Sequence, residues 1–178
     1  MLRVFLVPFL IILILAEERT ASYVAAAIFV VGAATDGLDG YLARRHAAVT
    51  KTGQWLDPLA DKILVAAAVI TLAAVRDFPI WAAVVIVARE VGVSLLRAYL
   101  GLRGIGMPAS RAAKVKTTLQ LVAITLYILP LGSGADGVKL GFLIAAVSMT
   151  VLTGMQYLLE VRTLLRGGSS PLPGQASP

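Results

Sequence analysis

Long apolar runs alternate with short polar or turn-forming stretches along most of this chain. The clearest breaks read "EERT", "RDFP", "GLRGIGMPAS" and "GSGADG". A membrane-spanning helix needs about 20 mainly apolar residues. The pattern therefore predicts an all-α, polytopic membrane protein with six transmembrane helices, near residues 2–16, 21–44, 54–75, 79–101, 111–131 and 138–162.

The composition agrees with this pattern, because 58% of the 178 residues are hydrophobic and only 15% are charged. We expect one membrane domain over residues 1–166 and a disordered tail over residues 167–178, which read "GGSSPLPGQASP". The absence of cysteine excludes disulfides, thiolate metal sites and cysteine nucleophiles.

The basic residues predict the orientation in the membrane. Of the 16 Lys and Arg, twelve fall at helix ends and loops on one side, three fall on the other, and Arg89 lies inside a helix. The positive-inside rule then places both termini and the charged stretch at residues 36–62 in the cytoplasm, in a multi-pass protein of the cell membrane. The net charge of +6 does not indicate a nucleic-acid partner, because no polar basic domain is present to bind one.

This stretch, "DGLDGYLARRHAAVTKTGQWLDPLADK", interrupts the apolar pattern with four aspartates. Residues three, four or seven apart share one face of a helix. Two such faces follow, one with Asp36, Asp39, Gly40, Ala43 and Arg44 and the next with Gly53, Asp57 and Asp61. A short connection makes the two helices antiparallel neighbours, so the four carboxylates can converge near the cytoplasmic end.

Four ionised carboxylates in a medium of low dielectric constant repel one another and call for a cation. Oxygen ligands, with no cysteine and with His46 the only histidine, favour Mg²⁺ or Mn²⁺ over zinc. Carboxylates on two facing helices suit a pair of ions, the arrangement that stabilises attacking and leaving oxygens in phosphate displacement. The alternative is a set of boundary aspartates paired with the neighbouring Arg and Lys side chains.

The stretch also matches, without a gap or substitution, the pattern D-x2-D-G-x2-A-R-x8-G-x3-D-x3-D, and in this the chain resembles the CDP-alcohol phosphotransferases. The resemblance implies a six-helix membrane enzyme, usually a homodimer, in which an alcohol acceptor displaces CMP from a CDP-linked lipid. It implies that Asp36, Asp39 and Asp57 are metal ligands, and that Asp61 is both a metal ligand and the base for the acceptor hydroxyl. It also implies CDP-lipid contacts for Asp39, Gly40, Ala43, Arg44, Thr50 and Gly53.

Basic residues of the fourth and fifth predicted helices indicate an anionic acceptor, such as a phosphate monoester. The candidate pocket consists of Arg89, Arg97, Arg111, Lys114 and Lys116. The alternative is a structural Arg89–Glu90 pair with ordinary cytoplasmic lysines. The texts "WLDPLADK", "ARE" and "KVKTTLQ" most resemble the bacterial phosphatidylglycerophosphate synthases, which implies CDP-diacylglycerol as donor and glycerol 3-phosphate as acceptor.

Other functions stay open at this point. Inositol-phosphate synthases share the aspartate motif, and cardiolipin synthases of the same fold accept phosphatidylglycerol. A different class is a small ion or proton-coupled transporter, since intramembrane carboxylates also mark transport paths. Relatives usually carry an "N-x-x-N-x-L-T" text before the first helix, whereas this chain starts with "MLRVFL". Either the start codon is assigned late or a part that helps to hold the CDP group is missing.

Overall fold

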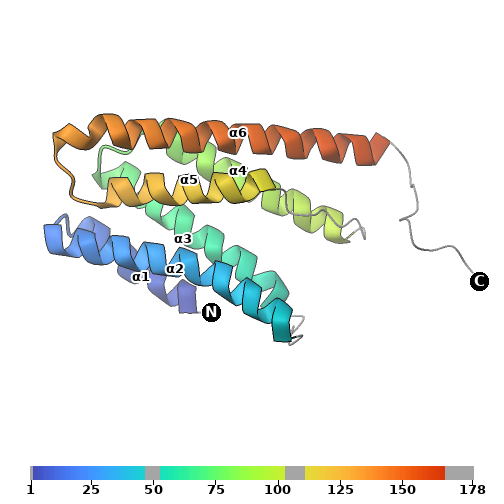
Figure 1. Ribbon diagram of the computed structural model, residues 1–178, viewed down its shortest axis with the longest axis horizontal. Coiled ribbons are helices and arrows are strands. Elements are labelled where there is room, and N and C mark those ends of the chain that lie inside the picture. Colours follow the sequence, from blue (N-terminus) through green and yellow to red (C-terminus); the bar gives the residue numbers. More distant parts are fainter. Residues whose placement is uncertain (1, 47–52, 103–110, 167–178) are drawn as a thin grey trace, which may run out of the picture.

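The computed structural model describes residues 2–46, 53–102 and 111–166, with side chains described for residues 5–34, 62–102 and 112–163. Within these ranges the chain forms α-helices and one short 3₁₀-helix, and no strand (Figure 1). The elements are α1 (Leu2–Leu15), α2 (Arg19–His46), α3 (Gly53–Val75), α4 (Ile80–Leu102), α5 (Arg111–Ile128), η1 (Ser133–Ala135) and α6 (Asp136–Arg166).

The six predicted helices agree with these bounds to within four residues, the largest difference being the end of α6 at Arg166. Two other differences have local causes. Helix α5 ends at Ile128, three residues before the predicted end, because the residue before Pro130 disfavours helical backbone angles. Helix α6 begins at Asp136, directly after η1, and an acidic residue in the first turn favours a helix start. The predicted tail, residues 167–178, lies outside the described residues.

One helix in the described part of the chain, within Ser133–Thr163, is both long and apolar enough to cross a membrane. Shorter apolar helical segments occur at Phe5–Leu15, Arg19–Ala34 and Lys62–Val75. Helix α4 has the length of a span, with 23 residues, but it carries internal charges that lower its hydropathy. Six membrane spans therefore remain a prediction.

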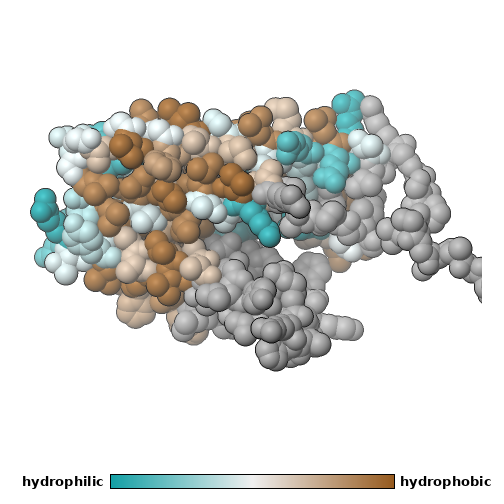
Figure 2. All heavy atoms as spheres, viewed as in Figure 1, coloured by the Kyte–Doolittle hydropathy of each residue, from teal (hydrophilic) through white to brown (hydrophobic). Residues whose placement is uncertain are grey.

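Large apolar side chains are exposed on all six helices, which favours contact with lipid rather than water. Examples from α1 to α6 are Phe5, Tyr23, Ile70, Leu95, Val115 and Leu152. Figure 2 shows hydrophobic residues covering much of the described face of the bundle, with hydrophilic residues gathered at its left end and toward the right.

The helices form two layers, which we call the α1–α3 layer and the α4–α6 layer (Figure 1). Helix α1 contacts both α2 and α3 in the first layer, and α6 contacts both α4 and α5 in the second. The layers meet where α3 contacts α4 and α5, and where α2 contacts α5.

Along the bundle, two halves differ in composition. The half that holds the α1–α2, α3–α4 and α5–α6 connections, here called the apolar half, contains a continuous hydrophobic core. Each helix contributes fully buried side chains to this core, among them Leu10, Phe29, Leu72, Ile86, Ile124 and Leu143. Phe78 and Tyr127 add an edge-to-face aromatic contact, with ring centroids 4.9 Å apart.

The other half, here called the polar half, holds the α2–α3 and α4–α5 ends of the helices. Its described hydrophobic cluster is small and consists of Leu100, Tyr157 and Val161 with two partly buried neighbours. Buried Lys116 and the partly buried Lys62, Arg89 and Glu90 lie in the helix segments between this cluster and the apolar core. The fold thus anchors the helices in one half and presents polar residues in the other.

Candidate active site

The predicted metal-binding aspartates lie on two helices that contact each other. Asp36 and Asp39 belong to α2, and Asp57 and Asp61 belong to α3. Their side chains lie outside the set that the structure describes. The remaining CDP-binding candidates are placed only by their backbone, with Gly40, Ala43 and Arg44 in α2 and Gly53 as the first residue of α3, while Thr50 lies outside the described residues.

A close contact between Gly32 and Leu64 brings α2 and α3 together next to these aspartates. A methyl group added at Gly32 would lie 3.0 Å from Cδ2 of Leu64, so only a glycine fits without a shift. Gly32 precedes Asp36 by four residues, and Leu64 follows Asp61 by three. Residues at these spacings share a helical face, so the contacting faces of α2 and α3 are the faces that carry the motif.

The donor set fits a divalent metal of the oxygen-binding class. All four candidate ligands are carboxylates on contacting helices, which is the ligand chemistry of Mg²⁺ and Mn²⁺. No group of three or more Asp, Glu or His side chains suited to a metal occurs among the described side chains, a set that excludes these four aspartates.

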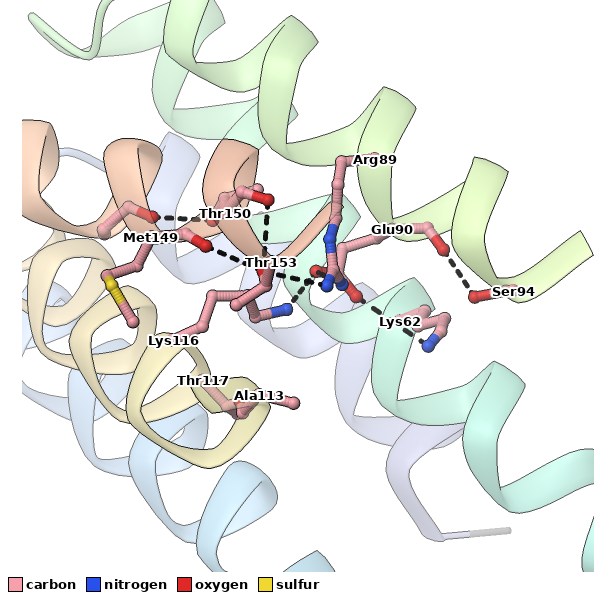
Figure 3. A network of polar contacts seen from close by, with 11 residues as sticks. Lys62, Arg89, Glu90, Ser94, Ala113, Lys116, Thr117, Met149, Thr150 and Thr153 are labelled. Carbon is pink, nitrogen blue, oxygen red and sulfur yellow. Dashed lines mark hydrogen bonds and ion pairs between the residues drawn. The ribbon is translucent and has the colours of Figure 1, made fainter. Parts of the chain in front are cut away.

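A second polar feature, here called the Glu90 cluster, lies between α3, α4 and α5 (Figure 3). The Glu90 carboxylate accepts a hydrogen bond from the Lys116 ammonium through Oε1. The same oxygen accepts a hydrogen bond of 3.1 Å from Nη1 of Arg89. The other oxygen, Oε2, lies 3.8 Å from Nζ of Lys62. Three cationic side chains are therefore paired with one carboxylate.

Arg89 extends this cluster to α6. Its Nη2 donates a hydrogen bond of 3.1 Å to Oγ1 of Thr153. The side chain also passes close to Gly154, where an added methyl group would lie 3.4 Å from Cγ of Arg89. Thr153 in turn donates to the carbonyl of Met149 at 2.7 Å, which fixes its hydroxyl as an acceptor for Arg89. Through Arg89, the cluster thus joins four helices.

These contacts divide the predicted acceptor-binding residues into two groups. Arg89 and Lys116 are bound to Glu90, and the Lys116 side chain is only 5% exposed. Arg97 and Lys114 are exposed and have no carboxylate partner among the described side chains. Arg97 lies over the ring of Tyr157, 5.8 Å from its centroid. The side chain of Arg111 lies outside the described set.

Sequence reasoning missed the part that Lys62, Thr153 and Tyr157 play around these cations. One signal was available, because Glu90 is the only acidic residue between Asp77 and Asp136. A single acidic residue inside a helix, among many basic ones, is expected to attract several of them. Hydroxyl partners such as Thr153 leave no comparable signal in the sequence.

Comparison with known proteins confirms the family resemblance. The profile of the CDP-alcohol phosphatidyltransferase family matches residues 1–154 of the chain. This range contains all four aspartates, the Glu90 cluster and all six helices except the last part of α6.

Similar proteins of known sequence cover most of the chain. A probable phosphatidylglycerophosphate synthase of Mycobacterium tuberculosis strain H37Rv is 38% identical over 161 residues, or 89% of this chain and 77% of the relative. A CDP-diacylglycerol–glycerol-3-phosphate 3-phosphatidyltransferase of Rickettsia typhi is 37% identical over 90% of this chain and 93% of its own length. The Bacillus subtilis strain 168 protein of the same name is 36% identical over 87% and 88%. The chain therefore belongs to the CDP-alcohol phosphatidyltransferase family, as its aspartate pattern predicted.

Proposed function

We propose that this protein transfers the phosphatidyl group of CDP-diacylglycerol to glycerol 3-phosphate, giving phosphatidylglycerophosphate and CMP. The observation that carries the proposal is the position of the complete aspartate pattern on two contacting helices, α2 and α3. The acceptor is supported by relatives named for this reaction in several bacteria.

Asp36, Asp39, Asp57 and Asp61 would hold two divalent ions, Mg²⁺ or Mn²⁺, and the general dependence of the family on a divalent metal supports this. When bound, such ions supply positive charge that neutralises the diphosphate of the lipid donor. The Gly32–Leu64 contact supports this assignment, because it brings together the helical faces on which the aspartates lie.

The chain's own residues provide the remaining chemistry. Asp61 takes the proton of the acceptor hydroxyl, whose oxygen forms a bond to the phosphorus of the phosphatidyl group. The bond from that phosphorus to the CMP oxygen breaks, and CMP leaves with the electron pair. Arg44 offers hydrogen bonds to the diphosphate. Asp39, Gly40, Ala43, Thr50 and Gly53 would complete the nucleotide site.

Exposed cations near the Glu90 cluster fit an anionic acceptor. The cluster combines Lys62, Arg89 and Lys116 with one carboxylate, so its net charge is positive. Arg97 and Lys114 can bind a phosphate directly because no described carboxylate competes for them. Arg89 and Lys116 would not contact the acceptor; they would attract it through the positive electrostatic potential of the cluster. Arg111, at the start of α5, completes the proposed pocket.

We also propose that the six helices cross the cell membrane, with both termini and the polar half of the bundle in the cytoplasm. The excess of basic residues on that side supports the orientation. A cytoplasmic site gives access to both the nucleotide-linked lipid and a soluble phosphate acceptor. A homodimer is expected from the family resemblance.

The test is an assay of purified protein in lipid nanodiscs with CDP-diacylglycerol, Mg²⁺ and one acceptor at a time. Glycerol 3-phosphate should give CMP and phosphatidylglycerophosphate in equal amounts. CMP release with inositol phosphate or phosphatidylglycerol, and none with glycerol 3-phosphate, would overturn the acceptor assignment. No CMP with any acceptor would overturn the transferase proposal for this chain.

A further inference from the structure

Glu90 of α4 contacts two other helices directly and is connected to a third through Arg89. It binds Lys116 of α5 and faces Lys62 of α3. It also binds Arg89, whose guanidinium donates a hydrogen bond to Thr153 of α6. Figure 3 shows Lys62 and Lys116 approaching the carboxylate from two separate ribbons, with Arg89 beside Glu90 on α4.

The contact with Lys62 differs from the others because it crosses between the two layers. Lys62 belongs to the α1–α3 layer, whereas Arg89, Lys116 and Thr153 all belong to the α4–α6 layer. Lys62 directly follows Asp61 in the sequence. The Glu90–Lys62 pair is therefore an ionic link between the proposed acceptor side and the helix that carries the proposed base.

Burial strengthens this link. The Glu90 side chain is 13% exposed, and those of Arg89 and Lys62 are 15% and 25% exposed. Attraction between charges increases as the surrounding dielectric constant falls. Glu90 is also the carboxylate that keeps three neighbouring cations from repelling one another, so its removal affects all three contacts at once.

We propose that Glu90 is a positioning residue for the transfer reaction. Through Lys62 it fixes the part of α3 that carries Asp57 and Asp61 relative to the α4–α6 layer, without itself contacting the substrate. This inference rests on the proposed function. A base that is displaced from the acceptor hydroxyl reacts slowly even when both substrates bind normally. Breaking the link should therefore lower kcat and leave KM nearly unchanged.

A double-mutant cycle tests whether Glu90 acts through Lys62. Glu90→Gln keeps the shape of the side chain and removes its charge, and Lys62→Met removes the cation. We expect each variant to lower kcat about tenfold and to leave both KM values within about twofold. The double variant should be no slower than the single ones, because both changes break the same link. Independent effects would multiply to about a hundredfold and would contradict the proposal.

The control is Lys139→Met, which removes an ion pair that lies within a single helix, at the other end of the molecule. Lys139 lies 3.1 Å from Asp136 within the first turn of α6. This variant should leave kcat unchanged, alone and in combination with Glu90→Gln. If Glu90→Gln does not fold, Glu90→Gln/Lys116→Met removes a buried positive charge together with the negative one. Its kcat should still fall about tenfold.

A distance measurement gives a readout that does not depend on activity. The chain contains no cysteine, so spin labels can be attached to single cysteines introduced at Ile63 of α3 and Leu158 of α6, both exposed. The distance distribution between the labels should broaden or shift in Glu90→Gln and in Lys62→Met, and it should stay as in wild type in Lys139→Met.

The two proposals fail in different ways. An unchanged label distance together with a lower kcat would show that Glu90 acts on the substrate directly, which overturns the positioning role. A rise confined to the KM for glycerol 3-phosphate would also overturn it. Absence of CMP release by wild-type protein would instead overturn the proposed function, and the label distances would still decide whether Glu90 links the layers.

Discussion

The apolar half and the polar half of the bundle hold the same helices together by different means. In the apolar half, side chains such as Phe29, Leu72 and Ile124 are fully buried against one another. In the polar half, one carboxylate and three cations connect the helices, and the described hydrophobic cluster is small. Apolar burial is non-directional, whereas a buried charge must keep its partner because an unpaired buried charge is strongly destabilising.

The polar half shows that basic residues of this chain can have a structural role as well as a binding role. Five basic residues were candidates for acceptor binding from sequence, with a structural Arg89–Glu90 pair as the alternative. The structure pairs both Arg89 and Lys116 with Glu90 and leaves Arg97 and Lys114 exposed. A basic residue inside a helix is therefore as apt to complete a structural cluster as to bind a ligand. The two halves then make opposite predictions for stability and for rate.

The largest effect should come from Asp61→Asn in the polar half. Loss of the proposed base should lower kcat by about 10³-fold or more, since general-base catalysis contributes about 10²–10⁴-fold. The thermal unfolding midpoint should stay near that of wild type, because no apolar contact is lost. CMP release and thermal unfolding in the same detergent measure the two quantities. A folded variant with more than a tenth of wild-type activity would contradict the role of Asp61 as base.

Phe29→Ala should produce the reverse result in the apolar half. Phe29 is fully buried, and truncating such a side chain costs about 3–5 kcal/mol in cores of soluble proteins. The midpoint of thermal unfolding should fall clearly, while kcat per folded molecule should remain within about twofold. A large fall in kcat for the protein that remains folded would show that the two halves are not energetically separate.

Lys116→Met and Lys114→Met distinguish the paired cation from the exposed one. Removing Lys116 should destabilise the fold. The loss should be smaller than that for a broken buried ion pair, which is about 3–5 kcal/mol, because Glu90 still has Arg89 and Lys62 as cationic partners. Lys114→Met should instead raise the KM for glycerol 3-phosphate about tenfold and leave the unfolding midpoint unchanged. Thermal unfolding and initial rates at varied acceptor concentration check the pair. A rise in KM for Lys116→Met with a loss of stability for Lys114→Met would contradict the assignment of Lys116 as the structural cation and Lys114 as the acceptor-binding one.

The smallest effect should come from Gly154→Ala, with Gly141→Ala as its control on the same helix. A methyl group at position 154 would lie 3.4 Å from Cγ of Arg89, whereas nothing lies within 4 Å of one at position 141. Gly154→Ala should therefore lower stability by up to about 1 kcal/mol relative to Gly141→Ala, which gains helix propensity of about that size. Thermal unfolding of both proteins tests this difference. Equal midpoints would show that Arg89 does not depend on the space above Gly154.

Local sequence patterns predicted the helices and the family, because hydrophobic runs and the aspartate spacing are properties of short segments. Correct prediction of the end of α5 at Ile128 and of the start of α6 at Asp136 would have required the effects of Pro130 and of the turn before α6. The role of Glu90 could not be predicted in full, because its partners come from α3 and α5, and their approach depends on packing in the apolar half. The spacing of the motif predicted that α2 and α3 meet, but not the close contact between Gly32 and Leu64.

Helices α1 and α6 differ more than twofold in length, with 14 and 31 residues. At 1.5 Å per residue they measure about 21 Å and about 46 Å, and the hydrocarbon core of a bilayer is about 30 Å thick. In the proposed membrane arrangement, α6 is longer than the core and must tilt or extend into the headgroup region. Membrane thickness, and with it acyl-chain length, is then a physical variable that acts on the orientation of this helix.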